Sequence, residues 1–200
     1  ASDEPGRERD VVHAALGVAP LAFPSPLRAC LNTAVDVALA EGCALGLAEV
    51  HDVASSTRVR AALDRGRLSA KVGLSVLGRL GDARALSAAL ERLTVPDAET
   101  RLAAMTAAEA LLSPKEADGR AVEPLARALS ARAVSRPERL RLVALLGRTG
   151  SERALPTLLP LLQTASDPAL AESAALALGT VPGPATARAP HRAAGGVRAR

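Results

Sequence analysis

One ten-residue string occurs twice in the chain and constrains the fold more than any other feature. Leu77–Leu86 and Leu146–Leu155 share the pattern Leu-Gly-Arg-x-Gly-x-x-Arg-Ala-Leu, with seven of ten positions identical and their starts 69 residues apart. That separation equals two units of about 34 or 35 residues, a period typical of stacked helical repeats. A unit of this size cannot bury its apolar face alone, so neighbouring units must stack around one continuous core.

The composition favours helices over strands. The 200 residues include no Ile, Trp or Tyr and only one Phe, whereas Ala and Leu are abundant. Ala and Leu are strong helix formers, and the missing types are among the residues that favour strands. A GC-rich genome explains this bias better than any functional demand. No apolar run in the chain is long enough to span a membrane.

Recurring caps predict where the first helix of each repeat begins. Thr94–Asp97 and Ser135–Glu138 share one pattern, a hydroxyl residue followed by proline and an acid, and Asp167-Pro168 is a close variant. Such side-chain oxygens accept the unpaired amide protons of a first turn, where proline has none to lose. The first helices then end in turns near Gly81, Gly119 and Gly150. Among the positions expected on apolar faces are Leu102 and Met105 of a first helix and Leu155, Leu158 and Leu162 of a second helix.

These signals divide the chain into four segments. Residues 1–24 are an N-terminal extension, 25–67 degenerate helical repeats that break near Gly42, 68–181 regular helix pairs, and 182–200 a disordered basic tail. The predicted fold is all-α, a right-handed α-α superhelix of about four to five helix pairs. The last first helix, roughly 168–180, has no second helix after it, so the tail, a partner or further repeats must cover that end.

The repeat unit resembles the HEAT repeat, and most closely the bacterial short form called the phycobilisome-lyase-type HEAT-like repeat. Residues 77–93 and 146–162 match its turn and second helix, and 109–129 match through an insertion around Ser113–Asp118. The resemblance implies an α-solenoid, and most such repeats bind other proteins. HEAT-like units often open with Asp-Pro-x-Val-Arg, whose arginine ties adjacent repeats. Arg101 and Arg139 are in position for that role, which Asp167–Ala171 has lost.

We predict no enzyme activity, no metal and no cofactor. The di-iron branch of the family that the chain resembles uses His-Glu pairs, and none of the three histidines precedes a glutamate. His51-Asp52 is an isolated doublet, which we interpret as a surface or capping feature rather than a metal site. A bilin lyase-like activity is implied only by the type of repeat, and a pigment pocket would lack Tyr and Trp.

Most of the net charge of +4 lies outside the predicted repeats. Residues 182–200 contain four arginines and no acid, whereas the rest of the chain is close to neutral. This distribution argues against a generally basic protein. Binding to the backbone of duplex DNA is nevertheless an alternative function, because Arg132, Arg136 and Arg139 recur at helical spacing and arginine neutralises phosphates without aromatic help.

A non-enzymatic scaffold or adaptor that binds another protein is the leading prediction. Solenoids present long concave surfaces that are lined by their second helices. The residues predicted to contact the partner are charged, and they are Arg92, Glu123, Arg127, Arg132, Arg136 and Arg139. The chain could belong to a larger assembly. We expect a cytoplasmic protein, with secretion or a periplasmic location after signal removal as the alternative.

The two cysteines are expected to be small buried thiols. Cys30 and Cys43 would lie roughly 20 Å apart on one continuous helix, too far for a disulfide. A helix break near Gly42 would allow a hairpin that brings them closer. Since small buried thiols are common in helical cores, the unpaired state is the prediction.

Overall fold

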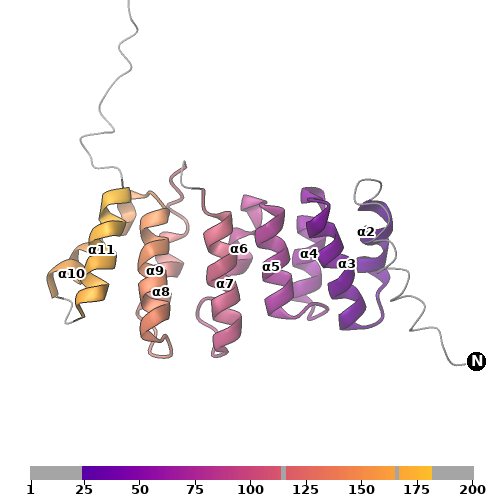
Figure 1. Cartoon of the computed structure of the whole chain (residues 1–200), viewed down its shortest axis with the longest axis horizontal. Coiled ribbons are helices and arrows are strands. Elements are labelled where there is room, and N and C mark those ends of the chain that lie inside the picture. The colour runs from indigo at the N-terminus through magenta and orange to yellow at the C-terminus, as the bar shows by residue number, and fades with distance from the viewer. Residues whose placement is uncertain (1–23, 114–115, 165–166, 182–200) are drawn as a thin grey trace, which may run out of the picture.

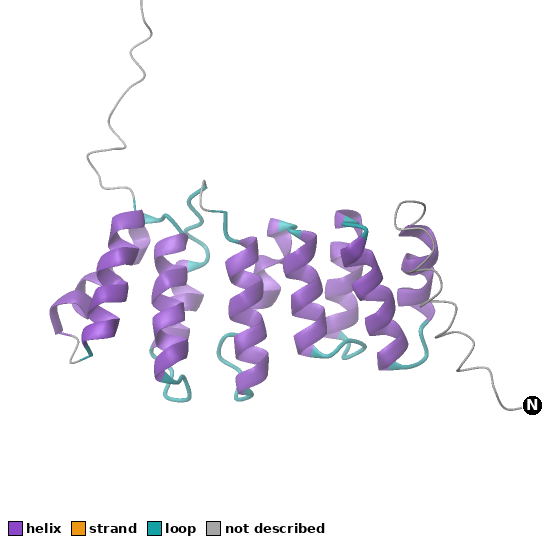
Figure 2. Ribbon diagram, viewed as in Figure 1, coloured by secondary structure: helices purple, strands orange, loops and turns teal. Residues whose placement is uncertain are grey.

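The computed structural model describes residues 24–113, 116–164 and 167–181. Within these ranges the chain consists of helices and connecting turns, with no strand (Figure 2). The helices form two rows that run the length of the molecule (Figure 1). The all-α fold predicted from the sequence is therefore confirmed.

One row contains the first helices of the repeats: α3 (Val37–Glu49), α5 (Ala70–Leu80), α7 (Ala98–Leu111), α9 (Arg136–Arg148) and α11 (Pro168–Thr180). The other row contains α2 (Pro24–Thr33), α4 (Ser56–Asp64), α6 (Leu86–Leu90), α8 (Val122–Leu129) and α10 (Leu155–Thr164). Short 3-10 turns precede three of the second helices: η1 (Val53–Ser55), η2 (Ala83–Ala85) and η3 (Glu152–Ala154). Four helix pairs, α3/α4 to α9/α10, thus lie between α2 and α11 in the described part of the chain.

The first helices begin at side-chain caps. The Asp97 carboxylate accepts a hydrogen bond from the backbone N of Thr100 at 2.7 Å, and Asp167 accepts one from Ala169 at 3.0 Å. In α9 the capping side chain belongs to a residue of the first turn itself. The Glu138 carboxylate accepts a hydrogen bond from the backbone N of Ser135 at 2.7 Å. Each bond satisfies an amide that the helix itself leaves unpaired. The caps predicted at these three helices are confirmed.

The turns between first and second helices share one polar position, occupied by Asp52, Asp82, Asp118 and Ser151. In the last three turns this side chain accepts a hydrogen bond from the backbone N two residues later, that of Arg84, Arg120 or Arg153, at 3.0 to 3.3 Å. Two of these turns contain a left-handed glycine, Gly81 (φ 69°) and Gly150 (φ 58°). Helix α7 ends at Leu111, and Gly119 follows the insertion that comes after this helix.

One buried core connects all the described helices, from Leu31 in α2 to Val181 after α11. Met105 and Leu158 are fully buried, as their helical spacing predicted. Leu102 and Leu162 were also expected on buried faces, but both are exposed. Each lies at the margin of its helix face, and the approach of the neighbouring helices decides whether such a margin is covered.

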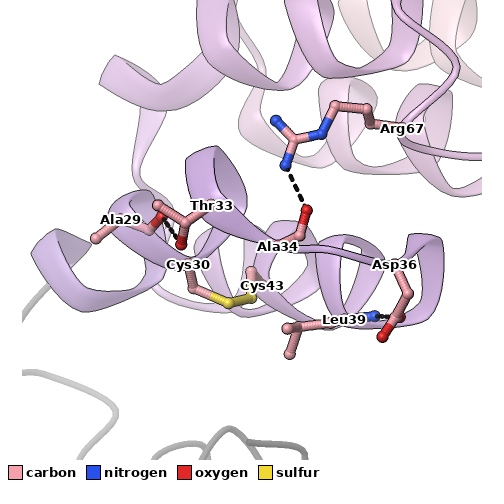
Figure 3. The surroundings of a disulfide bond; sticks show 8 residues. All are labelled: Ala29, Cys30, Thr33, Ala34, Asp36, Leu39, Cys43 and Arg67. Carbon is pink, nitrogen blue, oxygen red and sulfur yellow. Dashed lines mark hydrogen bonds between the residues drawn. A yellow bond between two sulfur atoms is a disulfide. The ribbon is translucent and has the colours of Figure 1, made fainter. Parts of the chain in front are cut away.

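The prediction of a helix break at Gly42 was wrong. The chain turns at residues 34–36, and Gly42 lies inside α3. The helices α2 and α3 therefore form a hairpin, with the Cα atoms of Cys30 and Cys43 6.1 Å apart and their sulfurs joined in a disulfide (Figure 3). The predicted pair of separate thiols is corrected to a disulfide.

The predicted extension and tail fall almost entirely outside the described residues. Of the extension, 1–24, the structure describes only Pro24, which opens α2. The predicted tail, 182–200, lies wholly outside the described ranges.

Candidate partner-binding surface

Many of the arginines form ties between neighbouring repeats. Arg67 donates to the carbonyl oxygens of Asn32 and Ala34, and Arg79 to the Glu49 carboxylate at 2.6 Å. Arg148 reaches back to the Leu112 carbonyl at 3.2 Å. These contacts span 30 to 36 residues of sequence, which is about one repeat. Such arginines hold the array together, so they are a poor indication of a surface for nucleic acid.

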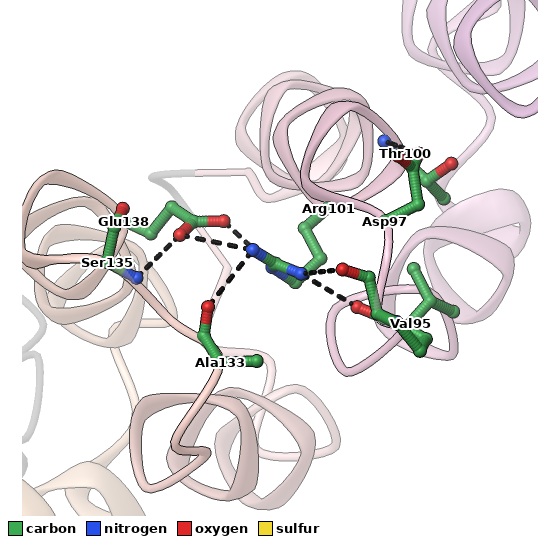
Figure 4. Close-up of polar contacts among 8 residues, drawn as sticks. Val95, Asp97, Thr100, Arg101, Ala133, Ser135 and Glu138 are labelled. Carbon is green, nitrogen blue, oxygen red and sulfur yellow. Dashed lines mark hydrogen bonds and ion pairs between the residues drawn. The ribbon is translucent and has the colours of Figure 1, made fainter.

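Arg101 is the most buried of these ties, with 5% of its side chain exposed (Figure 4). Its guanidinium donates to the Glu138 carboxylate at 2.8 Å and to the carbonyl oxygens of Val95, Pro96 and Ala133. Glu138 is itself 11% exposed. Arg101 thus joins the third helix pair to the fourth, as the resemblance implied for this residue.

The pKa of Glu138 reflects this environment. Burial alone would raise it, but hydrogen bonds from Arg101 and from Ser135 outweigh the burial and lower the pKa to about 2. Glu138 is therefore a carboxylate at neutral pH. Arg139, the other arginine proposed for the tying role, is exposed and forms no ion pair with a described residue. The tie predicted at Arg139 is not formed.

Two of the predicted partner-binding residues are engaged within the molecule. Arg92 donates to the Asp64 carboxylate at 2.8 Å and to the Ala88 carbonyl at 2.9 Å. Arg136 forms a bidentate ion pair with Asp167. Hydrogen bonding from Arg136 is the main reason that the pKa of Asp167 falls to about 2. The ion pairs with Asp64 and Asp167 join neighbouring repeats, and all of these contacts leave fewer donors for a partner.

The other four predicted residues are exposed, and two of them pair with each other. Glu123 and Arg127 form an i,i+4 ion pair on α8, with 3.1 Å between Oε1 and Nη2. Arg132 lies in the turn after α8, and Arg139 lies in the first turns of α9. Neither Arg132 nor Arg139 forms an ion pair with another of the six predicted residues.

A groove of about 360 Å³ opens between α6 and α8, in the row of second helices. Its apolar part is formed by Leu86, Leu90 and Pro124, and its polar part by residues that include Ser87, Thr94, Glu91, Arg84, Arg120 and Arg127. Arg127 is the one predicted residue that lines this groove. A groove of this size, with apolar and charged walls, can hold a few side chains of a protein segment.

Arg84, Arg120 and Arg153 occupy the same position in three successive turns, two residues after the capping side chain, and we call them the turn arginines. Arg84 and Arg120 line the groove, with 84% and 80% of their side chains exposed. Arg120 and Arg153 line a second, neighbouring groove of about 460 Å³. The turn arginines therefore lie along the edges of both grooves.

The turn arginines differ in how they are paired. Arg84 donates from Nε to Asp82 at 3.0 Å, and Arg120 donates from Nε and Nη2 to Asp118. The hydrogen bond from Arg84 keeps the pKa of Asp82 below its usual value, although burial opposes the shift. Since a guanidinium has five N–H donors, both arginines retain donors for a ligand. Arg153 follows a serine, Ser151, and forms no ion pair with a described residue.

The sequence contained a signal for the turn arginines that we did not use. Arg84 and Arg153 belong to the repeated Gly-x-x-Arg-Ala motif, and Arg120 lies in the variant Ala-Asp-Gly-Arg-Ala; we attributed the motif entirely to helix stacking. Stacking does account for its glycine and alanine, but the arginine between them is exposed.

No group of three His, Cys, Asp or Glu residues in the described ranges is placed to hold a metal ion. None of the described helices is long and apolar enough to cross a membrane. No protein-family model matches the chain, and no curated protein is significantly similar to it.

Proposed function

We propose that the protein is a non-enzymatic scaffold of HEAT-like repeats that binds another protein along its row of second helices. The observation that carries the proposal is the groove between α6 and α8 with Arg84 and Arg120 on its rim. Carboxylates of a partner segment can pair with these arginines in charge-assisted hydrogen bonds. Apolar side chains of the same segment can fill the space beside Leu90 and Pro124.

The repeat chemistry supports the assignment to HEAT-like repeats. The arginine that ties adjacent repeats in that family corresponds to Arg101, and its contacts with Glu138 and Ala133 join two successive pairs. The two rows of helices are the arrangement that HEAT-like repeats adopt (Figure 1).

The test is a comparison of R84A/R120A with R139A in a pull-down from the native host. All three arginines are exposed, but only Arg84 and Arg120 line the groove. We expect the wild type and R139A to retain one stoichiometric protein partner and R84A/R120A to lose most of it. Equal recovery with all three proteins would exclude the groove as the binding site.

Duplex DNA is the second candidate ligand, and the contacts of the arginines make it the weaker one. Of the three arginines at helical spacing, Arg136 is paired with Asp167, and the intervening Glu138 is a partly buried carboxylate held by Arg101. We expect no saturable change in fluorescence anisotropy when the protein is added to a labelled duplex at physiological salt. Tight binding with a steep salt dependence would replace the scaffold function with DNA binding.

A bilin lyase-like activity gains no support from the site. The two grooves are lined by arginine, acidic, aliphatic and hydroxyl side chains rather than by aromatic residues. A bilin added to the protein should therefore show no induced change in absorbance.

The disulfide favours an oxidising compartment over the cytoplasmic location expected from the sequence. Protein disulfides persist in secreted and periplasmic proteins and are rare in the cytosol. The test is to alkylate the protein during extraction from its native host and to measure its intact mass. An unalkylated pair that becomes alkylated only after reduction supports export, and two alkylated thiols before reduction contradict it.

A further inference from the structure

Two of the turn arginines are held by the carboxylate that caps the same turn. Asp82 accepts a hydrogen bond from the backbone N of Arg84 at 3.0 Å and another from Nε of the same arginine at 3.0 Å. Asp118 accepts from the backbone and the side chain of Arg120 in the same way. The hydrogen bond from each arginine lowers the pKa of its aspartate, so both aspartates are ionised at neutral pH. One aspartate therefore caps the turn and also balances the charge of its arginine.

The first turn shows the same pairing with an arginine from another helix. This turn has Ala54 in place of a turn arginine. Its aspartate, Asp52, instead accepts a hydrogen bond from Nε of Arg28 in α2 at 2.7 Å, and this bond is the main cause that lowers the pKa of Asp52. Each described turn with aspartate at the shared polar position thus contains a paired arginine.

The fourth turn differs because its capping residue is Ser151. The Ser151 hydroxyl accepts a hydrogen bond from the backbone N of Arg153 at 3.3 Å, so it retains the contact that shapes the other turns. Serine has no carboxylate, however, and the Arg153 guanidinium forms no ion pair or hydrogen bond with a described residue. The replacement of aspartate by serine therefore keeps the turn and leaves its arginine available.

Arg153 extends towards the third turn, where it lines the same groove as Arg120. The backbone N of Asp118 donates to the carbonyl oxygen of Thr149 at 2.8 Å, which joins the third turn to the fourth. A Cβ atom added at Gly119 would lie 3.2 Å from Cδ of Arg153 and 3.6 Å from its Nε. The Arg153 side chain therefore passes over the backbone of this glycine. Both arginines line the groove of about 460 Å³.

None of the described acidic residues around this groove is paired with Arg153. Asp118 lines the groove, but both of its carboxylate oxygens accept from Arg120. Glu116 also lines the groove, and Glu152 precedes Arg153 in the turn. Both glutamates are exposed and form no ion pair with a described residue. The groove therefore contains one arginine that its own turn neutralises and one that its turn does not.

We propose that Ser151 makes Arg153 the main anchor for an acidic side chain of the partner, within a segment that crosses both grooves and also contacts Arg84 and Arg120. This inference rests on the proposed function, because it concerns the same partner segment. A guanidinium already held by a carboxylate gains less from a second one, since its charge is balanced and some of its donors are used. The Arg153 guanidinium has all five N–H donors available for the ligand.

The spacing of the turns determines the design of a peptide probe. Neighbouring packed helices lie roughly 8 to 10 Å apart, so the turn arginines recur at about this interval. A polyproline II segment has three residues per turn, and every third side chain therefore projects from one side at intervals of about 9 Å. The probe is a fluorescein-labelled peptide of three Glu-Pro-Leu triplets. The same peptide with glutamine in place of glutamate is the control for charge.

R153A and S151D test the anchor by fluorescence anisotropy with the full chain. R153A should weaken binding of the glutamate peptide about tenfold or more, because it removes charge-assisted hydrogen bonds. S151D should weaken binding about threefold or more, because it places beside Arg153 the carboxylate that holds Arg84 and Arg120. Since aspartate caps two other turns, S151D should leave the melting temperature nearly unchanged. K71A, at an exposed cation that lines neither groove, should bind like the wild type.

D82S is the reverse test, and it does not depend on how the fourth turn accepts an aspartate. A serine hydroxyl at this position can still accept from the backbone N of Arg84, as Ser151 does from Arg153, but it releases the Arg84 guanidinium. D82S should therefore bind the glutamate peptide about threefold more tightly than the wild type. The double variant D82S/R84A should lose this gain.

The outcomes distinguish this inference from the proposed function. Unchanged peptide binding by R153A and S151D would overturn the role of Arg153, even if R84A/R120A loses its partner in the pull-down. Equal binding of the glutamine peptide, or no binding of either peptide, would overturn the acidic ligand and leave the pull-down as a separate test of the groove between α6 and α8. Binding of a labelled DNA duplex that S151D weakens would assign Arg153 to phosphates instead and would also overturn the proposal.

Discussion

The α9/α11 and α7/α9 junctions stack the same kind of helix in two different ways. At α9/α11 the side chain is absent at Gly147, and backbone packs against backbone at Ala177. Across the α7/α9 boundary the space is bridged by Arg141 with Glu109, and the adjoining turns are joined by Arg101 with Glu138. The first junction depends on volume, whereas the second depends on charge.

This difference teaches that a repeat period does not imply equivalent interfaces. A buried ion pair depends on both partners remaining charged, and the loss of one leaves the other desolvated. A glycine contact has no such dependence, but it tolerates no added atom. Changes in pH and changes in side-chain size should therefore affect different junctions of the same array.

The largest expected effect is from R101M. Methionine keeps much of the volume of arginine but leaves the Glu138 carboxylate, which is only 11% exposed, without its cation. Breaking a buried pair in this way typically costs about 3 to 5 kcal/mol. Urea denaturation of the full chain measures this loss in the free energy of unfolding. R139A is the control, since that arginine is exposed, and it should change the free energy by less than about 0.5 kcal/mol. Equal effects would remove the distinction between tying and surface arginines.

Acidification should weaken the charged junction first. The pKa of Glu138 is lowered from 4.5 to about 2 in the folded chain. A lowered carboxyl pKa adds stability that is complete above the unfolded value and is lost as pH falls from about 4.5 towards 2. The full loss amounts to about 3 kcal/mol for a shift of this size.

E138Q isolates this contribution from those of other carboxylates. Urea denaturation at several pH values between 7 and 3 should show a stability gap between wild type and E138Q that narrows as the pH falls. A gap that stays constant across that range would show that Glu138 does not titrate with the low pKa.

G147A tests the junction that depends on volume. Alanine would place its Cβ 2.6 Å from a backbone atom of α11, and overpacking of this kind costs about 1 to 3 kcal/mol. G179A is matched to it in sequence position, and with no neighbour there it should be neutral or stabilising by up to about 1 kcal/mol. Thermal melts of both variants measure the contrast, and equal melting temperatures would refute the steric argument.

The smallest expected effect is from G78A. The added Cβ would lie 3.3 Å from the Ala107 backbone, a contact that a shift of a few tenths of an ångström can relieve. The gain in helix propensity of up to about 1 kcal/mol opposes the remaining strain. The net loss in the free energy of unfolding should therefore be smaller than that of G147A. A larger loss in G78A than in G147A would mean that α5/α7 is the more rigid junction.

The sequence predicted the helical repeat and its caps because both depend on local patterns. Asp97 and Asp167 cap helices through contacts with the next few residues, and these spacings are visible in any chain. The role of Arg101 could also be read, since its position follows a cap. The exposure of Leu102 and Leu162 could not, because it depends on how far the next helix extends across each one.

The disulfide escaped prediction because its turn is marked only by a capping aspartate, a signal that we did not use there. Ala34-Val35-Asp36 contains neither glycine nor proline, and the break is set by Asp36, whose carboxylate accepts from the Leu39 backbone at 2.7 Å. Gly42 looked like the breaker, but it lies within α3. The pairing of Arg92 with Asp64 escaped prediction for a related reason, since contacts between repeats depend on the helix stacking.

The bond between Cys30 and Cys43 also determines how the molecule would carry a mechanical load. A pulling force applied at Pro24 passes from α2 through the sulfurs into α3 and bypasses the loop that they close, which spans 13 residues. Fully extended, that loop would lengthen the chain by roughly 40 Å. Tension cannot extend this loop while the disulfide is intact, and it can extend the loop once the disulfide is reduced.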